Sequence, residues 1–239
     1  MGKVTICDET PFRPITQIGQ YAGVCWGADI SNEIKNFNRG VKCIQSGHGR
    51  TIEFPDIYMI LDGYSARTIR ELYTHIGGAP TRLQASTRYI DYKDFDFTTP
   101  HTVLQNITAQ NIYHQTMQDI SKALQQLEEL GIPKEDSAML LPLGMATKIV
   151  FKVNLRELIQ IFNQRLCTRA YWEFRELMVD IKKALVKYGE QDIDYVFGKD
   201  NEWELVAKNL FVPKCVKDGV CYEEYSCGMR PQAEKRSFN

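Results

Sequence analysis

Two groups of residues in this sequence have types and spacings suited to chemistry, and the first is a loop. The segment "RELYTHIGGAPTRLQASTRYIDY" combines arginines, a histidine, a Gly-Gly pair and a Ser-Thr-Arg-Tyr run. Backbone N–H groups at Gly77 and Gly78 could cradle phosphate oxygens ahead of Arg82, although most Gly-Gly pairs are only turns. Neither a P-loop pattern nor a strand-linked G-x-G-x-x-G occurs, so those two nucleotide folds are excluded.

The second group lies on a long helix predicted from Leu155 to Tyr188. At about 100° per residue, Arg169 and Glu173 fall inside its apolar arc and Arg165 lies on the edge. A charge in such an arc costs several kcal/mol unless something pairs with it. Either Arg169 and Glu173 satisfy each other, or the arc faces a polar cavity with an anionic ligand, which the planar guanidinium suits. The apolar members of the arc are Leu155, Leu158, Ile159, Phe162, Leu166 and Leu177.

The chain has seven cysteines, an odd number. Cys215, Cys221 and Cys227 follow one another at equal spacing and could be zinc ligands, but the usual C-x2-C element is missing. Free or locally paired thiols are therefore the favoured interpretation. Cys167 is disfavoured as a nucleophile because no histidine follows it in the chain.

Simple signals predict the elements that position these residues. Ser65 is the expected N-cap of a helix over 66–76, which Gly77, Gly78 and Pro80 should end. A long helical pattern follows from Val103, stopped by glycine and proline after residue 130. Strands are predicted at 56–63 and 147–154, and helices at 33–46 and 155–188, followed by a less regular tail. The expected fold is α+β: a catalytic domain over 1–190 and a C-terminal extension over 191–239.

Composition narrows the classes of function. Among 239 residues, 44% are hydrophobic and 25% charged, which is typical of globular proteins. The net charge of −1 disfavours a protein that coats nucleic acid or an anionic membrane. No apolar run reaches the roughly 20 residues of a membrane span, and the N-terminus lacks a signal pattern. We therefore expect a soluble cytoplasmic protein.

Three blocks of the chain, in order, match elements of one known family. "SGHGRTIEFPD" is similar to a Gly-His-x-Thr-Pro-Phe-Glu element, with His48 and Glu53 at its spacing. "RELYTHIGGAPTRLQASTRY" is similar to a signature of a helix and a loop ending in Ser-x-Arg-Tyr. "LLPLGMATKIVFKVNLRELIQIFNQRLCTRAYWEFREL" follows the pattern Leu-Pro, strand, Asn-x-Arg, then Arg and Trp-Glu on a helix. From about Gly47 to Leu177 the chain resembles the flavin-dependent thymidylate synthases, the ThyX family.

The sequence departs from that family at its hallmark. The family has Arg-His-Arg followed by seven residues and a serine, whereas this chain has Thr74-His75-Ile76 and a longer interval to Ser86. The arginine expected before Leu-Pro corresponds to Ala138. Both changes remove positive charge where flavin and nucleotide phosphates would lie. Arg82, Arg50 or Arg169 are the candidates to replace it.

The resemblance implies a reaction, ligands and residue roles. The family transfers a one-carbon unit from 5,10-methylenetetrahydrofolate to C5 of dUMP, using FAD that NADPH reduces. By position, Arg165 would be catalytic, meeting the O2/N3 edge of the uracil. The implied substrate residues are Glu71, Thr74, Gln84, Ala85, Ser86, Arg88 and Arg165. The implied cofactor residues are Arg50, His75, Arg82, Gln84, Asn154, Arg156, Gln160 and Arg169, and no metal ligand is assigned.

The resemblance also implies a single ThyX-like domain of long helices packed on a mixed or antiparallel sheet, with sites shared in a homotetramer. Two alternatives stay open. A related pyrimidine-nucleotide C5 methylase or hydroxymethylase is favoured by the remodelled loop. A nucleotide-binding homologue without activity is favoured by the lost arginines. A classical thymidylate synthase is disfavoured because no Cys-His pair follows a proline.

Overall fold

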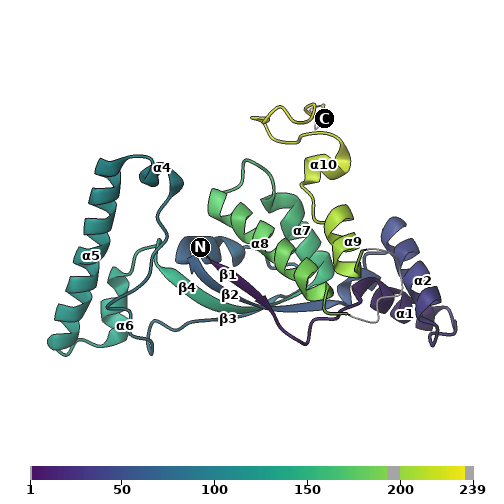
Figure 1. Ribbon diagram of the computed structural model, residues 1–239, viewed down its shortest axis with the longest axis horizontal. Coiled ribbons are helices and arrows are strands. Elements are labelled where there is room, and N and C mark those ends of the chain that lie inside the picture. The colour runs from purple at the N-terminus through teal and green to yellow at the C-terminus, as the bar shows by residue number, and fades with distance from the viewer. Residues whose placement is uncertain (1, 193–199, 235–239) are drawn as a thin grey trace, which may run out of the picture. The chain divides into compact units, whose positions relative to one another are not determined.

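The computed structural model describes residues 2–192 and 200–234 and has an α+β fold (Figure 1). Its four strands are β1 (Lys3–Ile6), β2 (Asp56–Ser65), β3 (Thr81–Gln84) and β4 (Ala146–Asn154). They form one antiparallel sheet in the order β1-β2-β4-β3. The α+β class and the sheet expected from the sequence are confirmed.

Helices supply the rest of the regular structure. Those before β4 are α1 (Pro14–Cys25), α2 (Glu33–Gln45), α3 (Ala66–Leu72), α4 (His101–Leu104), α5 (Ile107–Glu129) and α6 (Lys134–Ser137). Those after it are α7 (Leu155–Arg165), α8 (Trp172–Gly189), α9 (Glu202–Asn209) and α10 (Lys214–Asp218). Short 3-10 turns lie at Thr51–Glu53 and Ala138–Leu140. None of the helices in the described part of the chain is both long and apolar enough to cross a membrane.

The starts of several helices are encoded locally. A polar side chain precedes the first turn and accepts a hydrogen bond from the backbone N–H three residues later, which satisfies one of the open donors there. The residues that do so are Asn32, Ser65, Asn106, Asn154 and Asn201. Ser65 is thus the N-cap expected from the sequence. Asn154 is both the last residue of β4 and the N-cap of α7.

Contacts divide the chain into two compact units, each built from several segments. The first unit comprises residues 2–3, 60–74 and 82–151, and the second comprises the other described residues. Residues on both sides of position 190 lie in the second unit, and the boundary expected there stays a prediction. The internal packing of each unit is what positions its part of the site.

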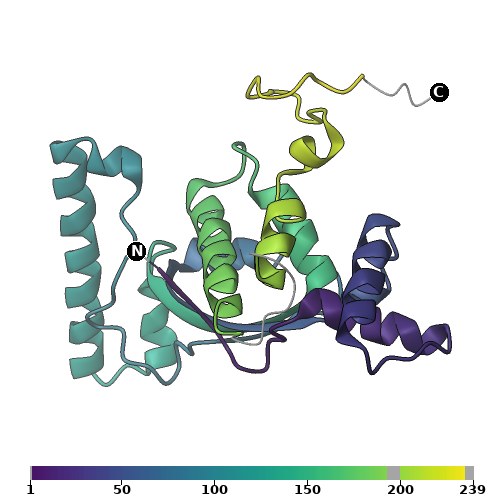
Figure 2. The same ribbon diagram turned by 45° about the vertical axis from the view of Figure 1, so that its right-hand side comes forward.

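The second unit has a packed aromatic and aliphatic core. Helices α7, α8 and α9 lie side by side in both views (Figures 1 and 2). Phe162 of α7 stacks on Phe211 with ring centroids 3.9 Å apart, and Trp203 of α9 is fully buried. Each such side chain contributes roughly 1.5–3 kcal/mol by leaving water. Glycines bring α1 and α2 close, because a Cβ at Gly19 would lie 1.8 Å from the Asn36 carbonyl oxygen.

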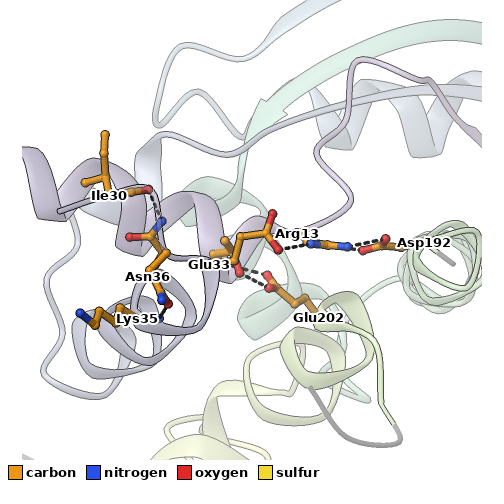
Figure 3. A network of polar contacts seen from close by, with 9 residues as sticks. Arg13, Ile30, Glu33, Lys35, Asn36, Asp192 and Glu202 are labelled. Carbon is orange, nitrogen blue, oxygen red and sulfur yellow. Dashed lines mark hydrogen bonds and ion pairs between the residues drawn. The ribbon is translucent and has the colours of Figure 1, made fainter. Parts of the chain in front are cut away.

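A polar network ties α9 to the start of α1 (Figure 3). The Glu202 carboxylate accepts hydrogen bonds from the backbone N–H groups of Ile15 and Thr16 at 2.6 and 2.9 Å, and from the Thr16 hydroxyl. Arg13 pairs with Asp192 and Glu33. A side chain distant in sequence thus caps α1, whose preceding Arg13 makes no cap of its own.

Three of the expected helices are wrong in extent. The helical pattern expected from Val103 is interrupted at Gln105 and Asn106, between α4 and α5. The helix predicted over 155–188 is two helices, because residues 166–171 form turns between α7 and α8. The Cys-Thr and Ala-Tyr pairs there include weak helix formers, and Arg175 donates to the Thr168 carbonyl oxygen at 2.7 Å, which stabilises the turn. The helix predicted over 66–76 ends at Leu72, five residues before Gly77.

Candidate functional site

The residues predicted to form the site divide between the two units. The second unit holds Arg50, His75, Asn154, Arg156, Gln160, Arg165 and Arg169. The first unit holds Glu71, Thr74, Arg82, Gln84, Ala85, Ser86 and Arg88. Apart from Arg165, every residue of the second-unit group is assigned to the cofactor. The first-unit group holds the other nucleotide residues together with the two remaining cofactor residues, Arg82 and Gln84.

In the second unit, the expected catalytic arginine is held by a histidine. Arg165 is the last residue of α7, and its Nε–H donates to Nε2 of His75 at 3.0 Å. His75 is buried, with 7% of its surface exposed, so its ring is fixed. Because Nε2 accepts this hydrogen bond, the ring proton lies on Nδ1. The contact sets the plane of the Arg165 guanidinium.

An aromatic ring supports the same pair. The Arg165 guanidinium carbon lies 4.8 Å from the centroid of the Phe174 ring, and the His75 ring lies 5.9 Å from it. A cation against an aromatic face is stabilised by about 0.5–2 kcal/mol. The C-terminal end of α7 also favours a positive charge. A guanidinium of fixed orientation suits bidentate donation to an imide edge or a phosphate.

The Gly-Gly loop rests on the start of α7. Asn154 caps the helix by accepting from the Glu157 N–H, and its amide donates to the Gly78 carbonyl oxygen at 3.4 Å. A Cβ at Gly77 would lie 2.2 Å from a Glu157 carboxylate oxygen. Gly78 has a positive φ of 65°, and a Cβ there would lie 2.3 Å from the Asn154 amide nitrogen. The glycines permit this close approach, a role that the phosphate-cradle hypothesis did not include.

A second arginine lies between Asn154 and Glu157 in the chain. Arg156 forms an ion pair with Glu53 at 2.6 Å. Gly49 lies close to the Arg156 guanidinium, because a Cβ added to Gly49 would be 3.0 Å from the guanidinium carbon. Arg50 approaches the other Glu53 oxygen at 3.8 Å and its side chain is 88% exposed. These ion pairs hold the motif block that contains His48 and Glu53 at the start of α7, where the Asn-x-Arg block also lies.

These donors fit a flavin nucleotide. Arg50, Arg156 and Gln160 have exposed side chains near the first turns of α7 and its preceding loop, where two guanidinium groups share the single carboxylate of Glu53. A diphosphate is bound well by exposed guanidinium groups and by helix N-termini. The fit rests on this donor set.

In the first unit, β3 places the second half of the signature. Arg82 donates to the Leu72 carbonyl oxygen at 3.3 Å and lies over the rings of Tyr73 and Phe151, at 4.9 and 5.5 Å. Gln84 donates to the Thr147 hydroxyl at 3.3 Å, and the Ala85 N–H to the Lys148 carbonyl oxygen. The arginine expected to replace lost charge is thus packed against α3 and β4.

The other first-unit residues lie in turns. The Ser86 hydroxyl accepts from the Arg88 N–H at 3.2 Å, and Arg88 pairs with Glu135 at 2.8 Å. Glu71 lies 3.9 Å from Arg67, one helical turn earlier. The Thr74 hydroxyl donates to the Glu71 carbonyl oxygen and closes the end of α3. An exposed ion pair of this kind contributes little to stability, so Arg88 can exchange Glu135 for an anion.

The predicted arc of Arg165, Arg169 and Glu173 is wrong. Arg169 lies in the turns between α7 and α8, is exposed, and approaches the Tyr225 ring at 5.7 Å. Glu173 lies in the first turn of α8, where it is buried. Both interpretations of the arc require a single helix, and α7 and α8 are separate helices.

Some contacts at the site were not assigned from the sequence. Phe174 carries no pattern that distinguishes it from a core residue. Glu53 belongs to the first motif block, but its partner Arg156 is 103 positions away, and no spacing in the sequence indicates the pair. Glu157 directly follows the Asn-x-Arg motif, and this adjacency is the sequence feature that could have indicated its place at the site.

All seven cysteines are free thiols. Within the residues that the structure describes, no three His, Cys, Asp or Glu side chains are grouped so as to hold a metal ion. Cys167, Cys215 and Cys221 nevertheless line one pocket of about 260 Å³.

Known proteins are similar to this chain in sequence and in fold. A protein from Nitratidesulfovibrio vulgaris named flavin-dependent thymidylate synthase is 28% identical over 92% of this chain and 88% of its own. The fold is similar to Helicobacter pylori thymidylate synthase X solved with FAD and dUMP, with a TM-score of 0.60, 19% identity, and coverage of 80% and 98%. It is also similar to a UMP/dUMP methylase from Streptomyces cacaoi bound with 5-Br dUMP, with a TM-score of 0.62, 16% identity, and coverage of 78% and 90%.

The family assignment rests on a match over most of the chain. Residues 9–188 match the family described as thymidylate synthase complementing protein. This range includes the three blocks read from the sequence and both groups of site residues, so the resemblance is confirmed. The chain belongs to the thymidylate synthase complementing protein family, that of the flavin-dependent thymidylate synthases.

Proposed function

We propose that this protein is an FAD-dependent thymidylate synthase, which converts dUMP to dTMP. The carbon donor would be 5,10-methylenetetrahydrofolate and the reductant NADPH. The observation that carries the proposal is the family match over residues 9–188. Within that range, buried His75 and the Phe174 ring hold Arg165 in a fixed orientation. Relatives named flavin-dependent thymidylate synthase support it.

The residues of this chain would bind, orient and stabilise. Arg165 would donate to the O2/N3 edge of the uracil and stabilise the negative charge that develops on the ring. Ser86 and Arg88 would hold the nucleotide phosphate, with Gln84, Ala85, Glu71 and Thr74 beside the nucleotide. Bound FAD, once reduced by NADPH, supplies hydride for the new methyl group.

The cofactor would lie along the start of α7. Arg50 and Arg156 would face its phosphates, and Asn154, Gln160 and His75 would contact the flavin. Arg82 and Arg169 are further candidates. Arg82 packs against Tyr73 and Arg169 lies over the Tyr225 ring, whereas Arg156 lies at the start of α7, so Arg156 is the strongest of the three. No metal ion is part of this proposal.

Assembly is also part of the proposal, because the family resemblance implies it. We infer a homotetramer whose sites take residues from neighbouring chains, working in the cytoplasm. Sedimentation of the purified protein with and without FAD and dUMP tests the assembly. A monomer that turns over at full rate would contradict it.

A second candidate keeps the flavin and changes the nucleotide or the product. It is favoured by Thr74 and Ile76, which replace the two signature arginines, and by the loop to Ser86. Such an enzyme would methylate or hydroxymethylate C5 of another pyrimidine nucleotide. Release of tritium from C5 of labelled dUMP and of labelled UMP, with the mass of each product, separates the two functions.

A further inference from the structure

Four of the seven cysteines gather at one place in the second unit. Cys167, Cys215 and Cys221 line the pocket of about 260 Å³, together with Lys214. The Cys227 thiol takes a hydrogen bond from the Thr168 side chain, next to Cys167 in the chain. These four residues, here called the thiol cluster, come from the turns after α7, from α10 and from the segment beyond it. The remaining three, Cys7, Cys25 and Cys43, lie before β2.

The four thiols lie near one another. Cys215 is close enough to Cys167, Cys221 and Cys227 for their charges to act on it. The Cys227 thiol also takes hydrogen bonds from the Thr168 side chain and the Met229 backbone. A metal ion stabilises every thiolate that coordinates it, so thiols gathered in this way are suited to hold one.

The segment after Phe211 also lacks a core of its own. Over described residues 212–234, Cys221 alone is buried. It exchanges backbone hydrogen bonds with Pro231 and Ala233, at 2.7 and 2.8 Å, and so pairs with a later part of the same segment. Segments of this size without a hydrophobic core are usually stabilised by disulfides or by a structural metal.

We propose that the thiol cluster binds one soft divalent metal ion, for which Zn²⁺ is the natural candidate, through Cys167, Cys215, Cys221 and Cys227. Four thiols lose their protons to solvent and four sulfur–zinc bonds form, with no change of oxidation state. In the described residues no three of these side chains are grouped closely enough to hold an ion, and the pocket exceeds the volume of one ion, so the four thiols would draw together on binding. A four-thiolate zinc site has a net charge of −2, which Lys214 at the pocket wall partly balances.

The metal would join the C-terminal segment to the turns that follow Arg165. Tyr225 already lies against Arg169, and Cys227 against Thr168, so the segment covers those turns. Closing the cluster would fix residues 166–171 and, through them, the end of α7. The four cysteines are therefore inferred to be positioning residues for Arg165, outside the reacting atoms.

Metal content and a cobalt titration of the full-length chain test the inference. The protein purified without chelator should contain one zinc per chain. After chelator treatment under reducing conditions, Co²⁺ should bind with the same stoichiometry and give thiolate-to-metal charge-transfer bands and intense tetrahedral d–d bands that Zn²⁺ abolishes. Absence of zinc together with absence of these bands overturns the proposal, as does a disulfide within the cluster found by mass spectrometry of the purified chain.

Single substitutions identify the ligands. Cys167→Ser, Cys215→Ser, Cys221→Ser and Cys227→Ser should each weaken Co²⁺ binding by at least about tenfold. Cys25→Ser changes an exposed thiol outside the cluster and should bind as the parent does. Because Cys221 is buried, its variant could lose structure, so the exposed Cys227 is the decisive position. Unchanged binding by Cys227→Ser overturns the four-ligand site.

Hydrogen exchange tests the positioning role without reference to catalysis. Addition of Zn²⁺ to the metal-free chain should slow exchange in 166–171 and 213–233, with α5 unchanged. Metal binding without protection of 166–171 contradicts the link to Arg165. Neither readout depends on flavin or nucleotide, so failure here is distinguishable from failure of the proposed function.

Discussion

Nε of Arg165 lies 3.0 Å from Nε2 of His75, although 90 residues separate them in the chain. His75 follows the shortened α3 and precedes the Gly-Gly loop, and Arg165 ends α7. The loop's contact with Asn154 and Glu157 places the histidine where it meets the arginine. The remodelled signature therefore keeps its histidine in a role that depends on the two glycines.

Removing the acceptor should misplace Arg165. We expect His75→Ala to lower the rate of tritium release from C5 of dUMP by about 100-fold, since catalytic groups displaced by about 1 Å lose rate on that order. His75→Gln keeps an acceptor oxygen and should retain most of the rate. His114→Ala, at an exposed histidine of α5, serves as the control. Equal losses in His75→Ala and His75→Gln would contradict a hydrogen-bonding role.

Gly78 is constrained twice, by its positive φ and by its contact with Asn154. Gly78→Ala should lower the free energy of unfolding by more than the roughly 1 kcal/mol typical of left-handed strain alone. Gly131 also has a positive φ, of 75°, but a Cβ added there would have nothing within 4 Å. Gly131→Ala therefore measures the cost of the backbone strain alone. Urea unfolding of both variants gives the comparison. Equal losses would show that the Asn154 contact adds nothing.

Arg156 should matter for the cofactor more than for stability. Its pair with Glu53 is half-exposed, and such pairs contribute about 0–1 kcal/mol. We expect Arg156→Ala to leave the melting temperature nearly unchanged and to weaken FAD binding about tenfold, corresponding to one lost charge-assisted hydrogen bond. Lys152→Ala breaks a surface pair of the same 2.6 Å length and should keep its FAD affinity. Fluorescence titration with FAD distinguishes the two.

Glu202 should give an unusual pH dependence of stability. Burial raises the pKa of this carboxyl, an effect that the hydrogen bonds from Thr16 and Ile15 and the charge of Arg13 oppose. A raised folded-state pKa means that the folded chain holds the proton more tightly than the unfolded chain. The resulting stabilisation is fully present below the unfolded value near 4.5 and is lost as pH rises through the folded pKa.

The matched variant is Glu202→Gln, which cannot ionise. The melting temperature of the parent relative to Glu202→Gln should rise as the pH falls from neutral toward 4.5. Scanning calorimetry of both proteins across that range provides the measurement. A relative melting temperature that falls on acidification would show that the donors to Glu202 outweigh its burial.

The local parts of the fold could be predicted from the sequence. Ser65 predicts the start of α3, alternating apolar and polar residues predict β4, and Gly131 predicts the end of α5. Each of these signals acts within a few residues. The break between α7 and α8 could not be predicted, since no proline or glycine lies in 166–171. A side chain of α8, Arg175, stabilises that turn.

Candidate residues for the site could be named from the sequence, but their contacts could not. The motif blocks point to Arg165, Asn154 and Arg156 by position. The contact between Glu53 and Arg156 and the support of Arg165 by Phe174 arise when distant segments pack. Tertiary packing of that kind leaves no periodicity or spacing in the chain.

The central claim is a flavin-dependent transfer to C5 of dUMP, and one anaerobic experiment tests it most directly. The purified protein is loaded with FAD, reduced with NADPH, and mixed with dUMP and 5,10-methylenetetrahydrofolate while the flavin absorbance and the nucleotide mass are followed. The account predicts that the flavin is reoxidised only when both substrates are present, and that dTMP forms in equal amount. Failure to bind FAD, or reoxidation without a methylated nucleotide, would contradict it.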